Sequence, residues 1–299
     1  NFSRNIVIRE NKYFYFKSFF RIIIKLSNVK KVYFYICFAL CCLTSVNAIA
    51  QTVAGLYTAH EPVANQSKKL RHVTVKQLFS SVLVKISGRV DVVNHPLIVP
   101  EMAKAMSYVT TFNYTVKDDK QSLEARFNET LVDQLLKRTG ISIWGNQRPS
   151  AMLWLSYEDE NNTRTIVSDT ADTVPNKLLK RQAAKRGLPL LLPLWDLEDQ
   201  FGLSITDVWG LFPDTVGIAN TRYATDFMIL SKVVEHGLTV QLNWAIYKQD
   251  IGGEQYSSIV ASGLDEFVSK ELAMIALVDQ TAGFFANQYS VDTSMSASG

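Results

Sequence analysis

The sequence predicts an α+β fold, with mixed or antiparallel sheets, helices packed on one face, and two α/β subdomains of similar size. Three observations support this prediction. The spacing of apolar residues changes between the helical and the strand period in both halves of the chain. Three consecutive strand-like segments precede one long amphipathic helix near the C-terminus. The chain after residue 50 is long enough to bury one large core or two small ones.

Residues 1–50 have the pattern of a leader. Lys30 and Lys31 precede an apolar run of twelve residues, and small residues follow as far as Ala48-Ile49-Ala50. This pattern is typical of a secretory signal peptide over about residues 30–50, so we expect cleavage after Ala50 and a periplasmic protein. An uncleaved inner-membrane anchor at Val32–Ala50 is the alternative, although a membrane span needs about 20 apolar residues. We interpret the residues before Lys30 as a mis-set start.

The leader also carries most of the positive charge. It contains eight Lys and Arg and one Glu, so the remaining chain has 23 basic and 27 acidic residues and a net charge of −4. A basic surface for nucleic acid is therefore not expected. All three cysteines, Cys37, Cys41 and Cys42, lie in the leader. The exported chain is thus neither a disulfide scaffold nor a thiol enzyme.

The predicted N-terminal subdomain spans residues 51–149. Ser67 is a suitable cap for a helix that Gly88 ends, and Asn128 for a helix that Gly140 ends. Between these helices, apolar residues alternate on both sides of a polar turn at 117–120, which predicts a β-hairpin. The other predicted elements are an extended segment at 53–63, a helix after Pro96 with Met102, Met106 and Val109 on one face, and a strand at 141–144.

The predicted C-terminal subdomain spans residues 150–289 and is followed by a flexible tail at 290–299. Residues 151–157 are apolar on both faces, which predicts a central strand with 164–167 as its hairpin partner. A loop at 169–176 and a helix at 177–186 follow. The remaining predictions are strands at 226–234, 238–248 and 255–262, turns at 235–237 and 252–253, and a helix from Leu264 to about Asn287 whose stripe includes Phe267 and Val268.

One stretch joins a helix to possible functional residues. Gly187 ends a basic helix, and residues 188–194 are predicted to form a short buried strand. Ligands bind at the carboxyl ends of strands in open α/β sheets, so the residues that follow are candidates. With other residues at element ends they form a candidate partner surface: Trp144, Arg148, Trp195, Asp196, Asp207, Trp209 and Arg222. Packing and helix capping would explain the same residues. We expect Arg148 and Arg222 to pair with Asp196, Asp207 or Asp226.

Motifs with catalytic spacing are absent. The sequence has no H-E-x-x-H, no P-loop, no G-x-G-x-x-G after a strand and no G-x-S-x-G. Its four histidines lie far apart, so we expect no metal site, and no cofactor is expected either. These observations favour a protein that is not an enzyme. The alternative is a hydrolase that uses carboxylates such as Asp196 with Asp207 or Asp226.

Several ordered motifs carry a resemblance. They are Ala54-Gly-Leu-Tyr with Pro62-Val, Val82-Leu-Val-Lys-Ile-Ser-Gly88, Trp144-Gly-Asn-Gln-Arg-Pro149, Arg186-Gly-Leu-Pro-Leu-Leu-Leu-Pro193, Asp207-Val-Trp-Gly210 and Arg222-Tyr223. Over roughly residues 53–250 the chain resembles the bacterial envelope family called domain of unknown function 2066. The resemblance implies an exported protein of Gram-negative proteobacteria, and it implies no activity. The lead from Arg222 into a hairpin is also similar to accessory periplasmic domains of the curli-secretion and TolB amino-terminal kind.

The sequence therefore favours a non-enzymatic binding or accessory module of the cell envelope. The expected partner is an envelope protein that the sequence does not identify, and nucleic acid is not expected to bind. Contact with the membrane is expected only through Val32–Ala50.

Overall fold

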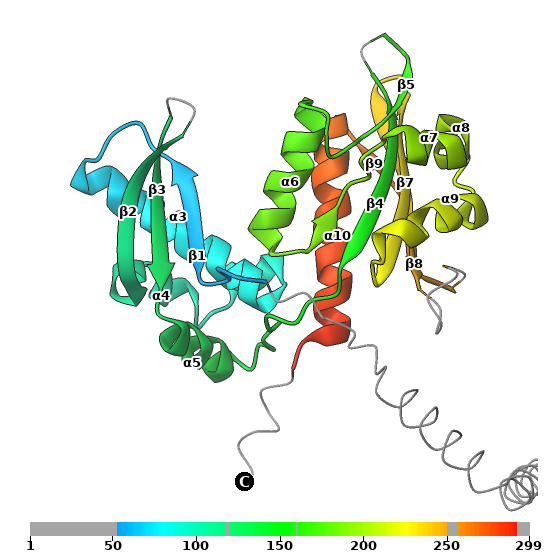
Figure 1. Cartoon of the computed structure of the whole chain (residues 1–299). Helices are drawn as coiled ribbons and strands as arrows, with labels where there is room; N and C mark the ends of the chain where they lie inside the picture. The colour runs from blue at the N-terminus through cyan, green and yellow to red at the C-terminus, as the bar shows by residue number, and fades with distance from the viewer. Residues whose placement is uncertain (1–52, 118–119, 160, 250–255, 257, 292–299) are drawn as a thin grey trace, which may run out of the picture. The chain divides into compact units, whose positions relative to one another are not determined.

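The computed structural model describes residues 53–117, 120–159, 161–249, 256 and 258–291 (Figure 1). Residues 50–299 form one compact unit. The predicted leader, the turn at 252–253 and the tail from residue 292 lie outside the described residues. Among the residues that are described, no helix is both long and apolar enough to span a lipid bilayer.

A three-stranded antiparallel sheet forms the first part of this unit. Its strands are β1 (Thr58–Pro62), β2 (Val109–Lys117) and β3 (Lys120–Phe127), in the order β1-β3-β2. The alternation along β3 turns Leu123, Ala125 and Phe127 into the core, as the predicted hairpin requires. The helices α3 (Lys68–Ser87) and α5 (Glu129–Thr139) complete this core (Figure 1).

The local signals for α3 and α5 are confirmed. The Ser67 hydroxyl accepts from the backbone N–H of Leu70, and the Asn128 side chain accepts from that of Leu131. Gly88 and Gly140 end the two helices in the left-handed conformation. These four residues satisfy helix-end backbone groups that would otherwise lack partners.

The single helix predicted after Pro96 is wrong. The segment after Pro96 divides into α4 (Val99–Met102) and η2 (Ala105–Tyr108), and η1 (Val90–Asn94) precedes it. The Tyr108 ring stacks on Phe79 with centroids 4.6 Å apart, and its hydroxyl donates to Glu101. We infer that tertiary packing of Tyr108 overrides the local helical pattern.

The predicted strand at 141–144 is also wrong. Ile143 forms only an isolated antiparallel bridge with Val291. The backbone N–H of Trp144 instead donates to the carbonyl of Ile86, in the last turn of α3. The segment therefore satisfies a carbonyl at the C-terminal end of α3, and it pairs with no strand beyond this bridge among the described residues.

A six-stranded mixed sheet forms the second part. Its main path is β5 (Arg164–Ile166), β4 (Ala151–Glu158), β7 (Phe227–His236), β8 (Thr239–Lys248) and β9 (Ser258–Phe267). The short β6 (Leu190–Leu191) also pairs with β4. Strand β4 runs parallel to β6 and β7, and all other pairs are antiparallel. The predicted central position of β4 is confirmed, since it is buried along nearly its whole length.

Helices cover both faces of this larger sheet. The helices α6 (Val174–Arg186) and α10 (Lys270–Tyr289) pack on one face. The short helices α7 (Leu197–Gly202), α8 (Ile205–Trp209) and α9 (Pro213–Asn220) supply a second core on the other face. The predicted α+β class, with mixed and antiparallel sheets, is confirmed. The predicted packing of helices on one face holds for the three-stranded sheet. It does not hold for the larger sheet, because helices cover both of its faces.

Several boundaries in this part differ from the prediction, and α6 begins at Val174, inside the predicted loop at 169–176. The helix expected from Leu264 begins at Lys270, because β9 continues and pairs Phe267 with Val240. The strand expected at 188–194 is only two residues long. Its neighbours Pro189 and Pro193 have no backbone N–H, which prevents a longer ladder. The subdomain boundary predicted after residue 149 falls between the two sheets, and it stays a prediction.

Candidate functional site

Arg148 lies at the meeting point of two helix ends and is completely buried. Its guanidinium donates to five backbone carbonyls, at 2.8–3.0 Å: those of Lys85, Trp144, Gly145, Arg186 and Gly187. Lys85 belongs to the last turn of α3, while Arg186 and Gly187 end α6. The arginine therefore satisfies the carbonyl ends of both helices, where a positive charge is also favoured by the helix dipoles.

Trp144 belongs to the same buried arrangement. Its ring lies 3.8 Å from the Arg148 guanidinium carbon, and it too is fully buried. Neither residue is accessible, so neither contributes to an exposed partner surface, contrary to the prediction. The expected pairing of Arg148 with a carboxylate is also wrong, because backbone carbonyls take all five of its N–H groups.

Two further cations lie beside Arg148. Arg186 donates to the carbonyl of Gly88 at 2.6 Å and lies 3.5 Å from Asp279. Lys85 donates to the carbonyl of Thr58 at 2.8 Å. Burial and the nearby Arg148 lower the pKa of Lys85 to about 8. Such a group makes the stability of the protein depend on pH.

The pKa of Lys85 predicts a rise in stability with pH. Because its folded pKa of about 8 lies below the ordinary value of 10.5, the unfolded chain binds more protons between these two values. The free energy of unfolding of the native chain, relative to Lys85→Met, should therefore rise by about 2 kcal/mol from pH 7 to pH 9.5. Urea unfolding of both proteins measures this difference. Both proteins contain the same tyrosines, so the effect of tyrosine ionisation on stability cancels when the two are compared. A difference that stays constant with pH would contradict the assignment.

Three of the predicted residues come together at the start of α7. The Arg222 guanidinium makes a bidentate pair with Asp196, at 2.8 and 3.1 Å, so the expected pairing of Arg222 with Asp196 is confirmed. Asp196 also caps α7 by accepting from the backbone N–H of Asp199. Trp195 lies directly before this cap, and the Gln200 side chain donates to its carbonyl. Capping and ion pairing therefore explain Asp196 and Arg222 locally.

Asp199 is the centre of this network, and sequence reasoning missed it. Its carboxylate accepts from Arg222, from the Tyr223 hydroxyl at 2.6 Å and from the backbone N–H of Trp195 at 2.8 Å. Burial, followed by the bond to Asp199, raises the pKa of Tyr223. The Asp-Leu-Glu-Asp spacing after the strand was the available signal, because an acidic residue three positions after a cap lies in the first helical turn.

Asp207 and Trp209 have separate local roles on α8. Asp207 forms a capping box with Ser204, with its carboxylate 2.6 Å from the serine hydroxyl. The half-buried Trp209 ring lies below Arg164, whose guanidinium carbon is 4.3 Å from the ring centroid. Lys232 lies 5.9 Å from the same centroid. These contacts are cation–π interactions and capping, and within the described part of the chain no hydrogen bond or ion pair joins either residue to the Asp199 network.

Two of the carboxylates proposed for hydrolysis, Asp196 and Asp207, have lowered pKa values. The hydrogen bonds from Arg222 lower the pKa of Asp196 to about 2. Those from Ser204 lower the pKa of Asp207. Asp226 accepts from the hydroxyl and backbone N–H of Ser150. A general acid at neutral pH needs a raised pKa, which neither Asp196 nor Asp207 has.

Apolar side chains point into solvent beside this network. Phe201 is 89% exposed and Leu197 is 72% exposed, and their spacing of four residues places them on one face of α7. Leu194 is exposed and Trp195 is half-buried next to them. We call these four residues, Leu194, Trp195, Leu197 and Phe201, the α7 surface.

The backbone around the α7 surface is strained. Trp195, Leu211 and Ala224 have positive φ angles of 54°, 57° and 47°. Together with Asn162 they are the non-glycine residues in this conformation within the described ranges. Bulky residues rarely adopt it, and such strain tends to concentrate at functional sites. The segment between β6 and β7 is therefore the main candidate site.

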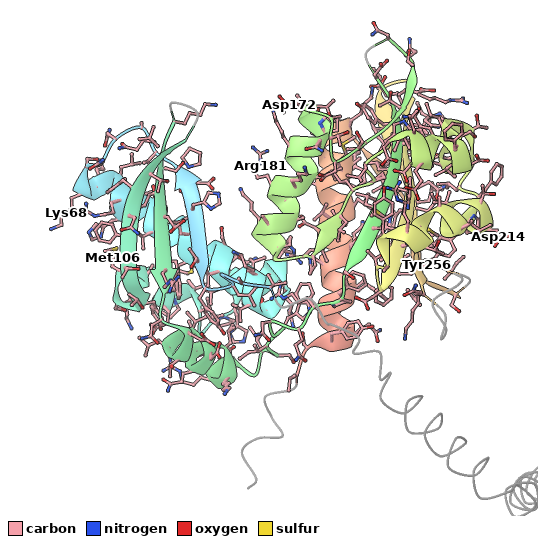
Figure 2. The ribbon with its side chains drawn as sticks, in the orientation of Figure 1. Lys68, Met106, Asp172, Arg181, Asp214 and Tyr256 are labelled. Atoms are coloured by element: carbon pink, nitrogen blue, oxygen red, sulfur yellow. The ribbon has the colours of Figure 1, made fainter. Side chains whose placement is uncertain are left out.

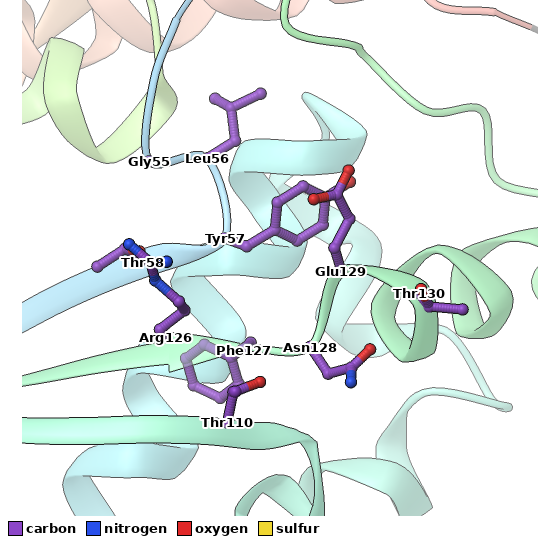
Figure 3. A pocket seen from close by; sticks show the side chains of 10 residues that line it. All are labelled: Gly55, Leu56, Tyr57, Thr58, Thr110, Arg126, Phe127, Asn128, Glu129 and Thr130. Carbon is purple, nitrogen blue, oxygen red and sulfur yellow. The ribbon is translucent and has the colours of Figure 1, made fainter.

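A pocket of about 450 Å³ lies in the first part of the unit (Figure 3). Tyr57 and Glu129 meet at its upper side in this view, and Tyr57 donates to Asp133 at 2.7 Å. Asn128, the cap of α5, also lines it. None of the seven predicted residues does. Within the described part of the chain, no group of three or more His, Cys, Asp or Glu is placed to hold a metal ion.

Comparison with known proteins gives one family match. The model described as "Domain of unknown function (DUF8605)" is similar to residues 50–145, which is less than half of the chain. This stretch contains the three-stranded sheet and the pocket of Figure 3. It does not contain the α7 surface. Because this family differs from the one that the motifs resemble, the resemblance stays a prediction.

Other comparisons add little. No curated protein matches the chain. One solved structure, described as "Crystal structure of uncharacterized protein", has 11% sequence identity and a TM-score of 0.16. The match covers 46% of this chain and 88% of the other. A score of this size supports no argument about fold or function.

Proposed function

We propose that this protein is a non-enzymatic binding module of the bacterial cell envelope, and that the α7 surface binds a protein partner. The observation that carries the proposal is the combination of backbone strain with outward apolar side chains. Phe201 and Leu197 gain no core packing where they lie, yet a hydrogen-bonded network fixes the turn that presents them. A surface that is already rigid loses little entropy on binding.

The composition of the surface supports a protein partner. Aromatic residues and arginine are enriched at the energetic centres of interfaces, and Trp195, Phe201 and Arg222 are residues of these types. Arg222 also lies 3.2 Å from the exposed Glu198, so charged groups border the apolar ones. An apolar centre with a charged border is the usual composition of a protein interface.

Export is the reason for placing the partner in the cell envelope. The basic start, the short apolar run and the small residues before Gln51 support a signal peptide. The resemblance to an exported envelope family agrees with this. The carboxylate hydrolase is less well supported, because Asp196 is bound bidentately by Arg222 and its pKa is lowered.

The double variant Leu197→Ser/Phe201→Ser tests this function. Photo-crosslinking from a probe placed at Gln200 in intact cells should capture a defined partner with the native chain. Capture should fall about tenfold or more in the variant, because truncating a central aromatic anchor commonly costs that much affinity. The melting temperature should change by no more than about 2 °C, since both side chains are exposed.

The matched control is Val116→Ser, which removes an equally exposed apolar side chain from β2. This variant should capture the partner as the native chain does. The proposal is wrong if the double variant and the control retain the same capture. It is also wrong if capture falls only in proportion to the loss of folded protein.

A further inference from the structure

A second cavity lies where the parallel strands β4 and β7 end. Its volume is about 990 Å³, and it shares no residue with the α7 surface. The first turns of α6 and α10 and the turn between β7 and β8 line it. Figure 2 labels Asp172, one of its lining residues, just before α6 begins. Ligands commonly bind beyond the carboxyl ends of parallel strands, and the volume is within the usual range for a binding site.

The cavity has an apolar floor and an apolar rim. Leu178, Val240 and Met274 are buried at its floor and belong to the main core. At the rim, Leu238 is 98% exposed, and Val268 and Val174 are 79% and 69% exposed. These three rim residues come from different elements, so no single amphipathic helix explains their exposure. Exposed apolar groups gathered around a hollow are typical of an interaction site.

Carboxylates outnumber cations in the lining. Asp159, Asp172, Glu235 and Glu271 line the cavity, and Lys270 is the single lysine or arginine among those lining residues that the structure describes. Lys270 lies 3.0 Å from Glu235 and donates to the carbonyl of Glu158. Its charge is therefore already paired within the protein.

The remaining carboxylates differ in their partners. Asp172 pairs with Lys177 at the mouth, at 2.7 Å. Asp159 accepts from the backbone N–H groups of Asn161 and Thr163, and no lysine or arginine among the described residues forms an ion pair with it. Glu271 has no side-chain partner among the described residues. Although two helix N-termini face this region, the excess of carboxylates opposes an anionic ligand and favours a cationic one.

We propose that this cavity binds a short segment of a protein partner that combines apolar side chains with lysine or arginine. The apolar floor and rim accommodate the apolar side chains, and Asp159 and Glu271 attract the cations. A small polyamine would satisfy the charge but would leave Leu238 and Val268 exposed. The combination of both features therefore selects a peptide segment.

A labelled peptide of alternating leucine and lysine is the probe for this proposal. Its binding to the whole exported chain is measured by fluorescence anisotropy, beside a matched peptide in which glutamate replaces each lysine. Leu238→Ser and Glu271→Gln should each weaken binding of the lysine peptide about tenfold. Leu264→Ser and Glu266→Gln on β9, which lie outside the cavity, are the matched controls and should leave binding unchanged.

Four outcomes decide the proposal. Selective loss of lysine-peptide binding in the two cavity variants supports it. The native chain must also bind the glutamate peptide at least tenfold more weakly than the lysine peptide. Equal loss in the cavity and control variants overturns it, because the peptide would then respond only to overall negative charge. Equal affinity for the two peptides overturns the charge assignment. Displacement of the peptide by spermidine at equal concentration indicates a polyamine site and overturns the assignment to a protein segment.

Discussion

Replacing Arg148 with methionine should lower the free energy of unfolding by about 4 kcal/mol, because buried carbonyls would lose their charged donor. The five N–H groups of this guanidinium bind five carbonyls, at the ends of α3 and α6 and in the segment just before Arg148. Methionine fills a similar volume but donates no hydrogen bond. Lysine at this position should recover little, because its three donors lack the planar fork of arginine.

Urea unfolding at neutral pH measures this effect. Arg181→Met is the matched control, because Arg181 is an exposed arginine on α6 (Figure 2). The control should change the free energy of unfolding by no more than about 0.5 kcal/mol. A loss below about 1 kcal/mol in Arg148→Met would contradict the role assigned to the arginine.

Gly88→Ala should lower the free energy of unfolding by about 3 kcal/mol, because a backbone cost and a packing cost add. Gly88 has a φ of 70°, and a Cβ atom there would overlap the Cβ of Ala286 in α10. Gly140→Ala separates the two costs. Gly140 also ends a helix with a φ of 70°, but nothing lies within 4 Å of its added Cβ.

The expected loss for Gly140→Ala is about 1 kcal/mol, which is the backbone cost alone. The double variant Gly88→Ala/Ala286→Gly should recover part of the remainder by removing the overlap. Calorimetric unfolding of the four proteins tests both statements. Equal losses for Gly88→Ala and Gly140→Ala would show that contact with α10 contributes nothing.

Local signals predicted the parts of the fold that depend on neighbouring residues in the chain. Ser67, Asn128 and Gly187 have the roles that their residue types suggested, since caps depend on backbone groups only a few residues away. The hairpin β2–β3 followed from alternation across a short polar turn, and β4–β5 followed from a continuous apolar run with a polar turn after it. The end of β9 was missed, because a partner strand extends it through a sequence that also has helical spacing.

The candidate site was predicted only in part. Trp195, Asp196 and Arg222 do come together, because a strand end and the lead into β7 meet beside α7. Arg148 and Trp144 are buried instead of exposed, and nothing in an Arg-Pro dipeptide indicates that distant carbonyls will surround the arginine. Leu197 and Phe201 were not among the predicted site residues, and apolar residues of this kind occur on buried helix faces as well. Their exposure depends on which side of α7 meets the sheet.

Arg148 also limits how the chain can be shortened. The segment similar to a known family ends at residue 145, three residues before this arginine. A piece cut there would keep the carbonyls of Lys85 and Trp144 but would lose the group that binds them. A piece extended to include Arg148 would still lack the carbonyls of Arg186 and Gly187. We therefore expect the three-stranded sheet to be less stable when it is cut out of the chain than within the whole chain.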